Sequence, residues 1–175
     1  MISTVMSDLG LSFDMEETLS HLVKLVLAYL LALPIGWNRE KEERSAGIRT
    51  FPLVAMAACG FAIIAIGVLG ADAPEQSKVL EGLITGVGFI GGGAILKQGA
   101  QARGTATAAS LWGTGALGAA VGYGLVDIAV ILSAVTYLAL RILSPLKDVA
   151  REDSAAQAAR GEAELRAEAA GKAGG

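Results

Sequence analysis

Three ionisable side chains lie inside long apolar runs of the sequence: Lys24, Glu81 and Asp127. A charge in a bilayer is costly unless it is paired or hydrated, so such residues are candidates for a functional site. Mg²⁺ prefers carboxylate and water oxygens, which makes Glu81 and Asp127 candidate metal ligands and indicates no other cofactor. The alternative is that each side chain reaches the lipid headgroups, because all three lie close to the end of their run.

Hydroxyl side chains form a second pattern. Thr107, Ser110 and Thr114 are spaced three and four residues apart, which places them on one face of a helix. Thr85 adds a polar position to the preceding apolar run. These hydroxyls could bond to a facing helix, line a polar pathway, or bond back to carbonyls of their own helix.

Glycines are concentrated in the same two runs. In lipid, helices associate where small residues let their backbones approach, so these glycines are candidate packing positions. They are Gly82, Gly86, Gly88, Gly92 and Gly93 in the third run, and Gly113 and Gly118 in the fourth. They could pack the chain's own helices, form the face of a homo-oligomer, with a dimer favoured, or open the backbone to a ligand.

The composition predicts the elements that carry these residues. The chain is 53% hydrophobic and 18% charged, and a bilayer core about 30 Å thick needs roughly 20 mostly apolar residues per helix. Five such runs occur, at 19–37, 50–70, 79–96, 106–122 and 125–143. The sequence therefore predicts an all-α, polytopic membrane protein with five transmembrane helices. The alternative is that the Gly-rich third or fourth run is a broken or re-entrant helix.

The distribution of charge predicts the orientation. Of the 14 Lys and Arg residues, all but Lys24 and Lys78 fall on one side of the five runs. The positive-inside rule places that side in the cytoplasm, with the N-terminus outside and the C-terminus inside. Residues 1–18 then form a periplasmic segment, 19–143 the membrane domain in the bacterial inner membrane, and 144–175 an Ala-rich, charged, disordered cytoplasmic tail.

Five residues are expected at the cytoplasmic rim. They are Arg39, Glu40, Arg49, Arg103 and Trp112. The block that begins at Arg39 is typical of a solvated collar that faces the headgroups. Alternatively, the three arginines could engage an anionic lipid, a phosphate or an acidic partner.

Other function classes find no support in the sequence. The single Cys59 lies in an apolar run and His21 stands alone, so neither a zinc site nor a catalytic triad is indicated and we expect no enzyme. No basic face for nucleic acid emerges.

Three motifs in order resemble the MgtC/SapB family of bacterial membrane proteins. They are Gly36–Glu40 with Ala46–Thr50, Glu81–Leu96, and Arg103–Trp112, and the likeness covers about residues 20–143. Glu81 stands where members of that family commonly have Gln, and Gly92 where Ala is usual. Members best known from virulence carry an added cytoplasmic domain, whereas this chain continues in its Ala-rich tail and resembles a short form.

The resemblance implies a role in magnesium homeostasis and growth at low Mg²⁺. In one account the protein regulates other membrane proteins, including the proton-translocating ATP synthase, by direct helix contact. In the other it moves Mg²⁺ itself, with Glu81 and Asp127 on the path of the cation. We favour the first account, because small-residue stripes suit helix contacts and few ionisable groups lie at membrane depth.

Overall fold

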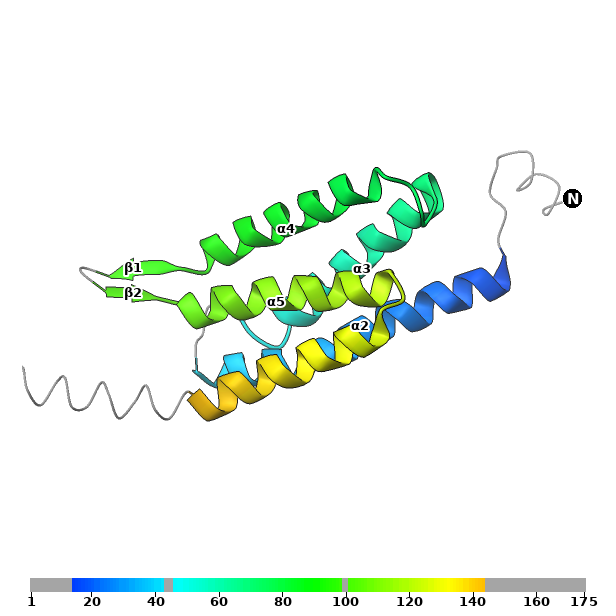
Figure 1. Cartoon of the computed structure of the whole chain (residues 1–175). Helices are drawn as coiled ribbons and strands as arrows, with labels where there is room; N and C mark the ends of the chain where they lie inside the picture. Colours follow the sequence, from blue (N-terminus) through cyan, green and yellow to red (C-terminus); the bar gives the residue numbers. More distant parts are fainter. Residues whose placement is uncertain (1–13, 43–45, 99–100, 144–175) are drawn as a thin grey trace, which may run out of the picture. The chain divides into compact units, whose positions relative to one another are not determined.

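The computed structural model describes residues 14–42, 46–98 and 101–143 of the chain. Its helices and strands are shown in Figure 1. The helices are α2 (Met15–Glu42), α3 (Thr50–Leu69), α4 (Gln76–Gly93), α5 (Thr105–Gly122) and a final helix, Val126–Leu143. Between α4 and α5, strand β1 (Leu96–Gln98) pairs antiparallel with β2 (Gln101–Arg103), in the register Leu96 to Arg103.

Each of the five predicted runs corresponds to one helix, so the all-helical class is confirmed. The third and fourth runs form the continuous helices α4 and α5, rather than broken ones. Among the described helices, α2, α3 and the final helix are long and apolar enough to cross a membrane. The helices α4 and α5 are not in that set. Gly, Thr and Ser dilute the apolar content of α5, and Gln76, Lys78 and Glu81 lower the hydropathy of α4 further.

Some boundaries differ from the sequence prediction, most clearly at the start of the first helix. The first helix begins at Met15 rather than Leu19, because Asp14 Oδ1 accepts hydrogen bonds from the amides of Glu16 at 2.9 Å and Glu17 at 3.3 Å. A carboxylate at this position satisfies free N–H groups and complements the helix dipole. The connection between α4 and α5 contains the β1–β2 hairpin, which was not predicted from the sequence.

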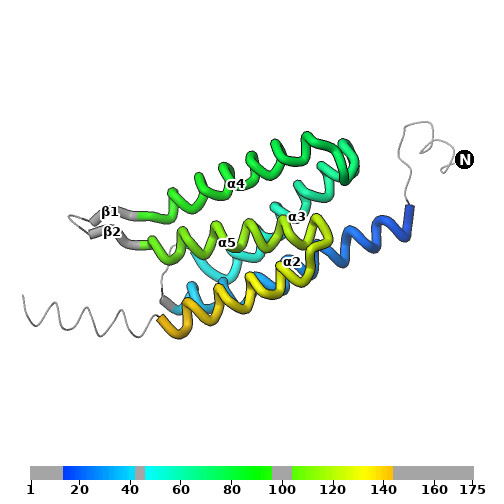
Figure 2. The backbone as a smooth tube through the Cα atoms, viewed as in Figure 1, coloured from blue at the N-terminus to red at the C-terminus, as the bar shows by residue number. Residues whose placement is uncertain are grey.

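The helix α5 lies at the centre of the packing. It contacts α2, α3 and α4, and in Figures 1 and 2 it runs between α4 and α2. Its second half is almost completely buried from Leu117 to Gly122. A helix rich in Gly, Ala, Ser and Thr can occupy this place because small side chains allow neighbouring backbones to approach closely.

The chain divides into two compact units, Met1–Tyr137 and Leu138–Gly175. All of the packing described below lies in the first unit. Of the second unit, the structure describes residues 138–143, which end the final helix. The predicted tail, 144–175, lies outside the described residues, as do residues 1–13 of the predicted periplasmic segment.

The outer faces of these helices carry large apolar side chains. Phe89 is 85% exposed and Val68 is 77% exposed, and similar residues occur on every described helix except α5, where Trp112 is the large exposed side chain. Exposing this much apolar surface to water would cost free energy, whereas exposing it to lipid would not. The surface is that of a protein whose helices face hydrocarbon.

Candidate functional site

Lys24 binds a helix end instead of a carboxylate. Its Nζ donates a hydrogen bond to the carbonyl oxygen of Gly122, the last residue of α5, at 3.3 Å. The last carbonyls of a helix lack partners within the helix, and a cation there is also favoured by the helix dipole. Glu81 in α4 and Asp127 in the final helix are both exposed. The three charges inside the apolar runs therefore have different surroundings.

The candidate metal ligands remain untested. Within the described ranges, no group of three or more His, Cys, Asp and Glu residues comes close enough to hold a metal ion. Glu81 and Asp127 alone would leave most of the octahedral shell of Mg²⁺ to water. Metal binding by this pair therefore stays a prediction.

The hydroxyls mostly bond within their own helices. Ser110 Oγ donates to the carbonyls of Ala106 at 2.8 Å and Thr107 at 3.0 Å, and Thr114 Oγ1 donates to Ser110 at 2.8 Å. On α4, Thr85 Oγ1 donates to the Glu81 carbonyl at 2.9 Å. Of the three alternatives, the structure supports the bond back to the helix for Ser110, Thr114 and Thr85, because each hydroxyl proton is already used.

The glycines of α5 pack the chain's own helices. A Cβ atom at Gly118 would overlap the Ala55 carbonyl oxygen of α3, and one at Gly122 would lie 2.7 Å from the Cys59 carbonyl oxygen. At Gly113 a Cβ atom would meet Thr136 Oγ1 of the final helix at 3.6 Å, an ordinary contact. Gly118 is therefore the predicted packing position at which two backbones approach most closely.

The glycines of α4 behave differently. A Cβ atom at any of five of them would meet nothing within 4 Å: Gly82, Gly86, Gly88, Gly92 and Gly93. Only Gly91 among the glycines of this helix lies against a neighbour, with a Cβ position 3.1 Å from the Ala108 carbonyl oxygen of α5. Packing within the chain therefore accounts for the glycines of α5 and leaves most of those of α4 unexplained.

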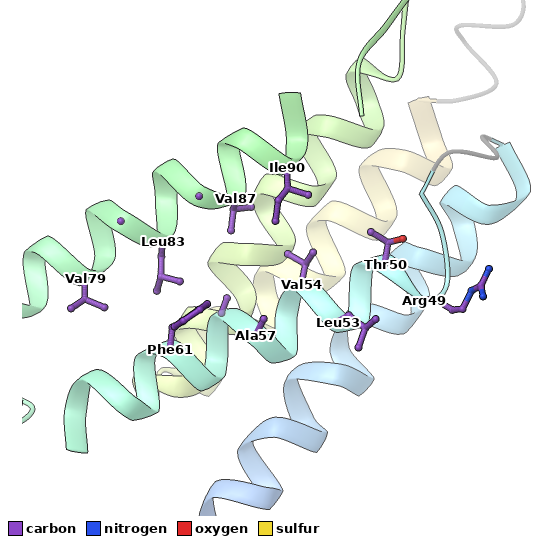
Figure 3. Close-up of a pocket in the computed structure, with 13 residues that line it drawn as sticks. Arg49, Thr50, Leu53, Val54, Ala57, Phe61, Val79, Leu83, Val87 and Ile90 are labelled. Atoms are coloured by element: carbon purple, nitrogen blue, oxygen red, sulfur yellow. The ribbon is translucent and has the colours of Figure 1, made fainter. Parts of the chain in front are cut away.

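An apolar groove of about 790 Å³ separates α3 from α4. Figure 3 shows Leu83, Val87 and Ile90 of α4 opposite Val54 and Phe61 of α3. Gly82 and Gly86 form part of its α4 wall, and Arg49 and Thr50 lie at one end. This groove could not be predicted from the sequence, because its apolar residues look like those of any lipid-facing helix.

The open glycines of α4 thus belong to two stripes. Gly82 and Gly86 face the groove. Gly88 and Gly92, spaced four apart, line neither the groove nor the smaller pocket between α4 and α5. They share a helical face with Thr85 and Glu81, which are also exposed. This outer stripe, Glu81, Thr85, Gly88 and Gly92, faces away from the other described helices.

The connection between α2 and α3 is held by Glu40. Its Oε2 accepts a hydrogen bond from the Ile48 amide at 3.1 Å. A Cβ atom at Gly47 would overlap this carboxylate, and one at Gly36 would lie 3.2 Å from the Gly47 carbonyl oxygen. The motif residues Gly36, Glu40 and Gly47 therefore form one contact that turns the chain from α2 into α3.

We expect Glu40→Ala to loosen this connection. The variant removes a hydrogen bond to a charged acceptor and should lower the free energy of unfolding by about 1 kcal/mol, less than for a buried bond because Glu40 is exposed. Thermal unfolding in detergent measures the change. Glu40→Gln keeps an acceptor oxygen and should lose less; equal losses in both variants would contradict the assignment.

The five rim residues occupy different environments. Arg39 is 1% exposed, so the expectation that it faces headgroups is wrong; its Nη2 donates to Asn38 Oδ1 at 3.4 Å. Arg49 is exposed at the start of α3. Trp112 lies about two turns into α5 and is 53% exposed. The backbone of Arg103 lies in β2, and its side chain is outside the described part of the structure.

Comparisons with known proteins match most of the region that is predicted to lie in the membrane. The sequence profile of the MgtC family matches residues 25–149. The chain is 36% identical to protein SrpB of Synechococcus elongatus over 81% of this chain and 79% of SrpB. It is 37% identical to MgtC of Brucella abortus over 70% of this chain and 50% of that protein.

A third relative is YhiD of Escherichia coli K12, which is named as a candidate magnesium transporter; it is 33% identical over 74% of this chain and 63% of YhiD. The match thus spans most of SrpB but only about half of the Brucella MgtC. No solved structure matches the chain. Together with the apolar helices, the profile match shows that this chain is a helical membrane protein and belongs to the MgtC family.

Proposed function

We propose that this protein is a bacterial inner-membrane protein of magnesium homeostasis that supports growth at low Mg²⁺ by binding other membrane proteins through α4. The magnesium link is supported by the names of two relatives, MgtC and the candidate magnesium transporter YhiD. The regulated partners include ATP synthase in the account that the family resemblance implies. A second copy of this chain, in a dimer, would use the same kind of contact.

One observation carries the proposal. The outer stripe of α4 presents Gly88 and Gly92 to open space, although glycine weakens a helix unless close approach requires it. In lipid, a Gly-xxx-Gly step is suited to the close packing of a second helix. The described helices of this chain do not use this step, which supports a helix of another chain as its partner.

The described cations support the proposed orientation. Three cations lie at the α2–α3 connection: Arg39, Lys41 and Arg49. Lys78 lies at the start of α4, and this end of α4 faces the opposite surface of the bundle. The positive-inside rule therefore supports a multi-pass protein with the α2–α3 connection in the cytoplasm and Met15 toward the periplasm.

Leucine at both Gly88 and Gly92 tests the helix contact. The double variant should abolish chemical crosslinking between α4 and its partner and should lose growth at limiting Mg²⁺ in cells that depend on this protein. Gly67→Leu is the matched control, because Gly67 is an exposed glycine of α3 with open space around it. Normal growth of the double variant would refute the proposal.

A flux assay separates this proposal from transport. The purified chain in liposomes should show no Mg²⁺ movement above that of empty liposomes, measured with an internal magnesium-sensitive dye. The relative named as a candidate transporter favours the alternative. Flux that disappears in Glu81→Gln or Asp127→Asn would establish that alternative and overturn ours.

A further inference from the structure

We propose that the groove between α3 and α4 binds one acyl chain of an anionic phospholipid from the cytoplasmic leaflet, with Arg49 engaging the phosphate. The groove lies beside the outer stripe but does not include Gly88 or Gly92. The inference uses the orientation given above and needs neither the magnesium role nor the partner contact.

The shape and lining of the groove fit a single hydrocarbon chain. Its volume of about 790 Å³ is within the range of roughly 300–1,000 Å³ found for small-molecule sites. Figure 3 shows that the groove extends along both helices, from Phe61 and Val79 at one end to Thr50 and Ile90 at the other. Leu53 and Phe61 are 53% and 58% exposed there, although both are large and apolar. A hydrocarbon chain would cover these surfaces along the length of the groove.

The polar groups lie at one end only. The Arg49 side chain is exposed and, within the described residues, makes no hydrogen bond or ion pair. In Figure 3 its side chain extends outward from the end of the groove. The first amides of α3 are already used, since those of Thr50 and Phe51 donate to the Gly47 carbonyl at 3.0 and 3.2 Å. The guanidinium is therefore the cationic group available to bind an anion at this end, and the Thr50 hydroxyl lies beside it in the lining.

This arrangement favours a lipid over a second copy of the chain. One cation at the end of an otherwise apolar groove matches a molecule with one anionic head and a long apolar tail. A transmembrane helix would place apolar residues along the groove but would have no need for a cation at its mouth. Basic residues beside grooves between membrane helices on the cytoplasmic side are suited to anionic headgroups.

The test is native mass spectrometry of the full chain in detergent. Equal amounts of phosphatidylglycerol and phosphatidylcholine with identical acyl chains are the probes. We expect one retained phosphatidylglycerol per chain and a preference of about fivefold over phosphatidylcholine, as for one basic side chain near an anionic group. Arg49→Gln should remove the preference. Lys41→Gln, which removes another exposed cation at the same end of the bundle, should keep it.

A second pair of variants tests the acyl site. Ala57 is an exposed residue in the wall of the groove, so Ala57→Leu should fill it and reduce retention of both lipids. Ala134→Leu adds the same atoms to an exposed position of the final helix and should have no effect. Slow labelling of buried Cys59 by a maleimide confirms that each variant is folded.

Three results would overturn the proposal: equal retention in Ala57→Leu and Ala134→Leu, a headgroup preference that survives Arg49→Gln, or a lipid-free dimer whose formation Ala57→Leu prevents. The first two would mean that lipid coats the whole surface without a site. The third would assign the groove to a second copy. Neither the growth assay nor the magnesium flux assay enters these readouts, so the groove and the function proposed above can fail separately.

Discussion

Gly118→Ala should unfold the bundle although it adds a single methyl group. The new Cβ atom would overlap the Ala55 carbonyl oxygen, and it would lie within 2.8 Å of the Ala55 Cα atom. Both neighbours are backbone atoms of α3, so relief requires α3 and α5 to separate. Overpacking costs about 1–3 kcal/mol when side chains can shift, and we expect about 3 kcal/mol or more here because they cannot.

The chain provides its own reporter and control for this prediction. Cys59, the single cysteine, is fully buried in α3, so the rate of maleimide labelling measures opening of the bundle. Labelling should accelerate strongly in Gly118→Ala. Gly67→Ala changes a glycine of α3 with open space around it and should be neutral or stabilising by up to about 1 kcal/mol. Equal labelling rates in the two variants would disprove the close approach of α3 and α5.

Arg39→Ala should cause the second large loss of stability. Arg39 is 1% exposed and is the largest fully buried side chain among the described residues. Its removal leaves a cavity at the end of α2, and truncation of large buried side chains costs about 2–5 kcal/mol. Arg39→Lys should recover only part of the loss, because lysine lacks the planar guanidinium that packs and donates in several directions.

Arg49 is the matched control for Arg39. Both arginines flank the α2–α3 connection, but Arg49 is exposed. Arg49→Ala should therefore change the unfolding temperature in detergent little, whereas Arg39→Ala should lower it by many degrees. If both variants had the same stability as the wild type, the burial of Arg39 would be wrong and its assignment to the headgroup collar would be restored.

Glycine has different roles in the two Gly-rich helices, α4 and α5. In α5, Gly118 and Gly122 are spaced four apart and pack against α3. In α4, Gly88 and Gly92 have the same spacing and pack against nothing in the described part of this chain. A stability assay should therefore detect substitutions in α5, and an association or growth assay should detect those in the outer stripe of α4.

The sequence by itself determined the number and the approximate limits of the helices. Runs of apolar residues and the charged blocks between them depend on local composition, and hydrocarbon imposes a helix on any such run. The all-helical membrane class was predictable for this reason, whereas the family was predictable from its three motifs in order. The start of α2 was harder to predict, because the carboxylate of Asp14, which lies outside the apolar run, caps the helix and extends it.

Only the tertiary structure decided which residues meet. Identical Gly-xxx-Gly spacings cannot reveal whether a helix faces its own chain or open space, so the division between α4 and α5 needed the packing. The same holds for the charges: Lys24 binds the end of α5, and Arg39 is buried while Arg49 is exposed. These outcomes depend on contacts between residues far apart in the chain, such as Lys24 with Gly122, and local patterns carry no information about such contacts.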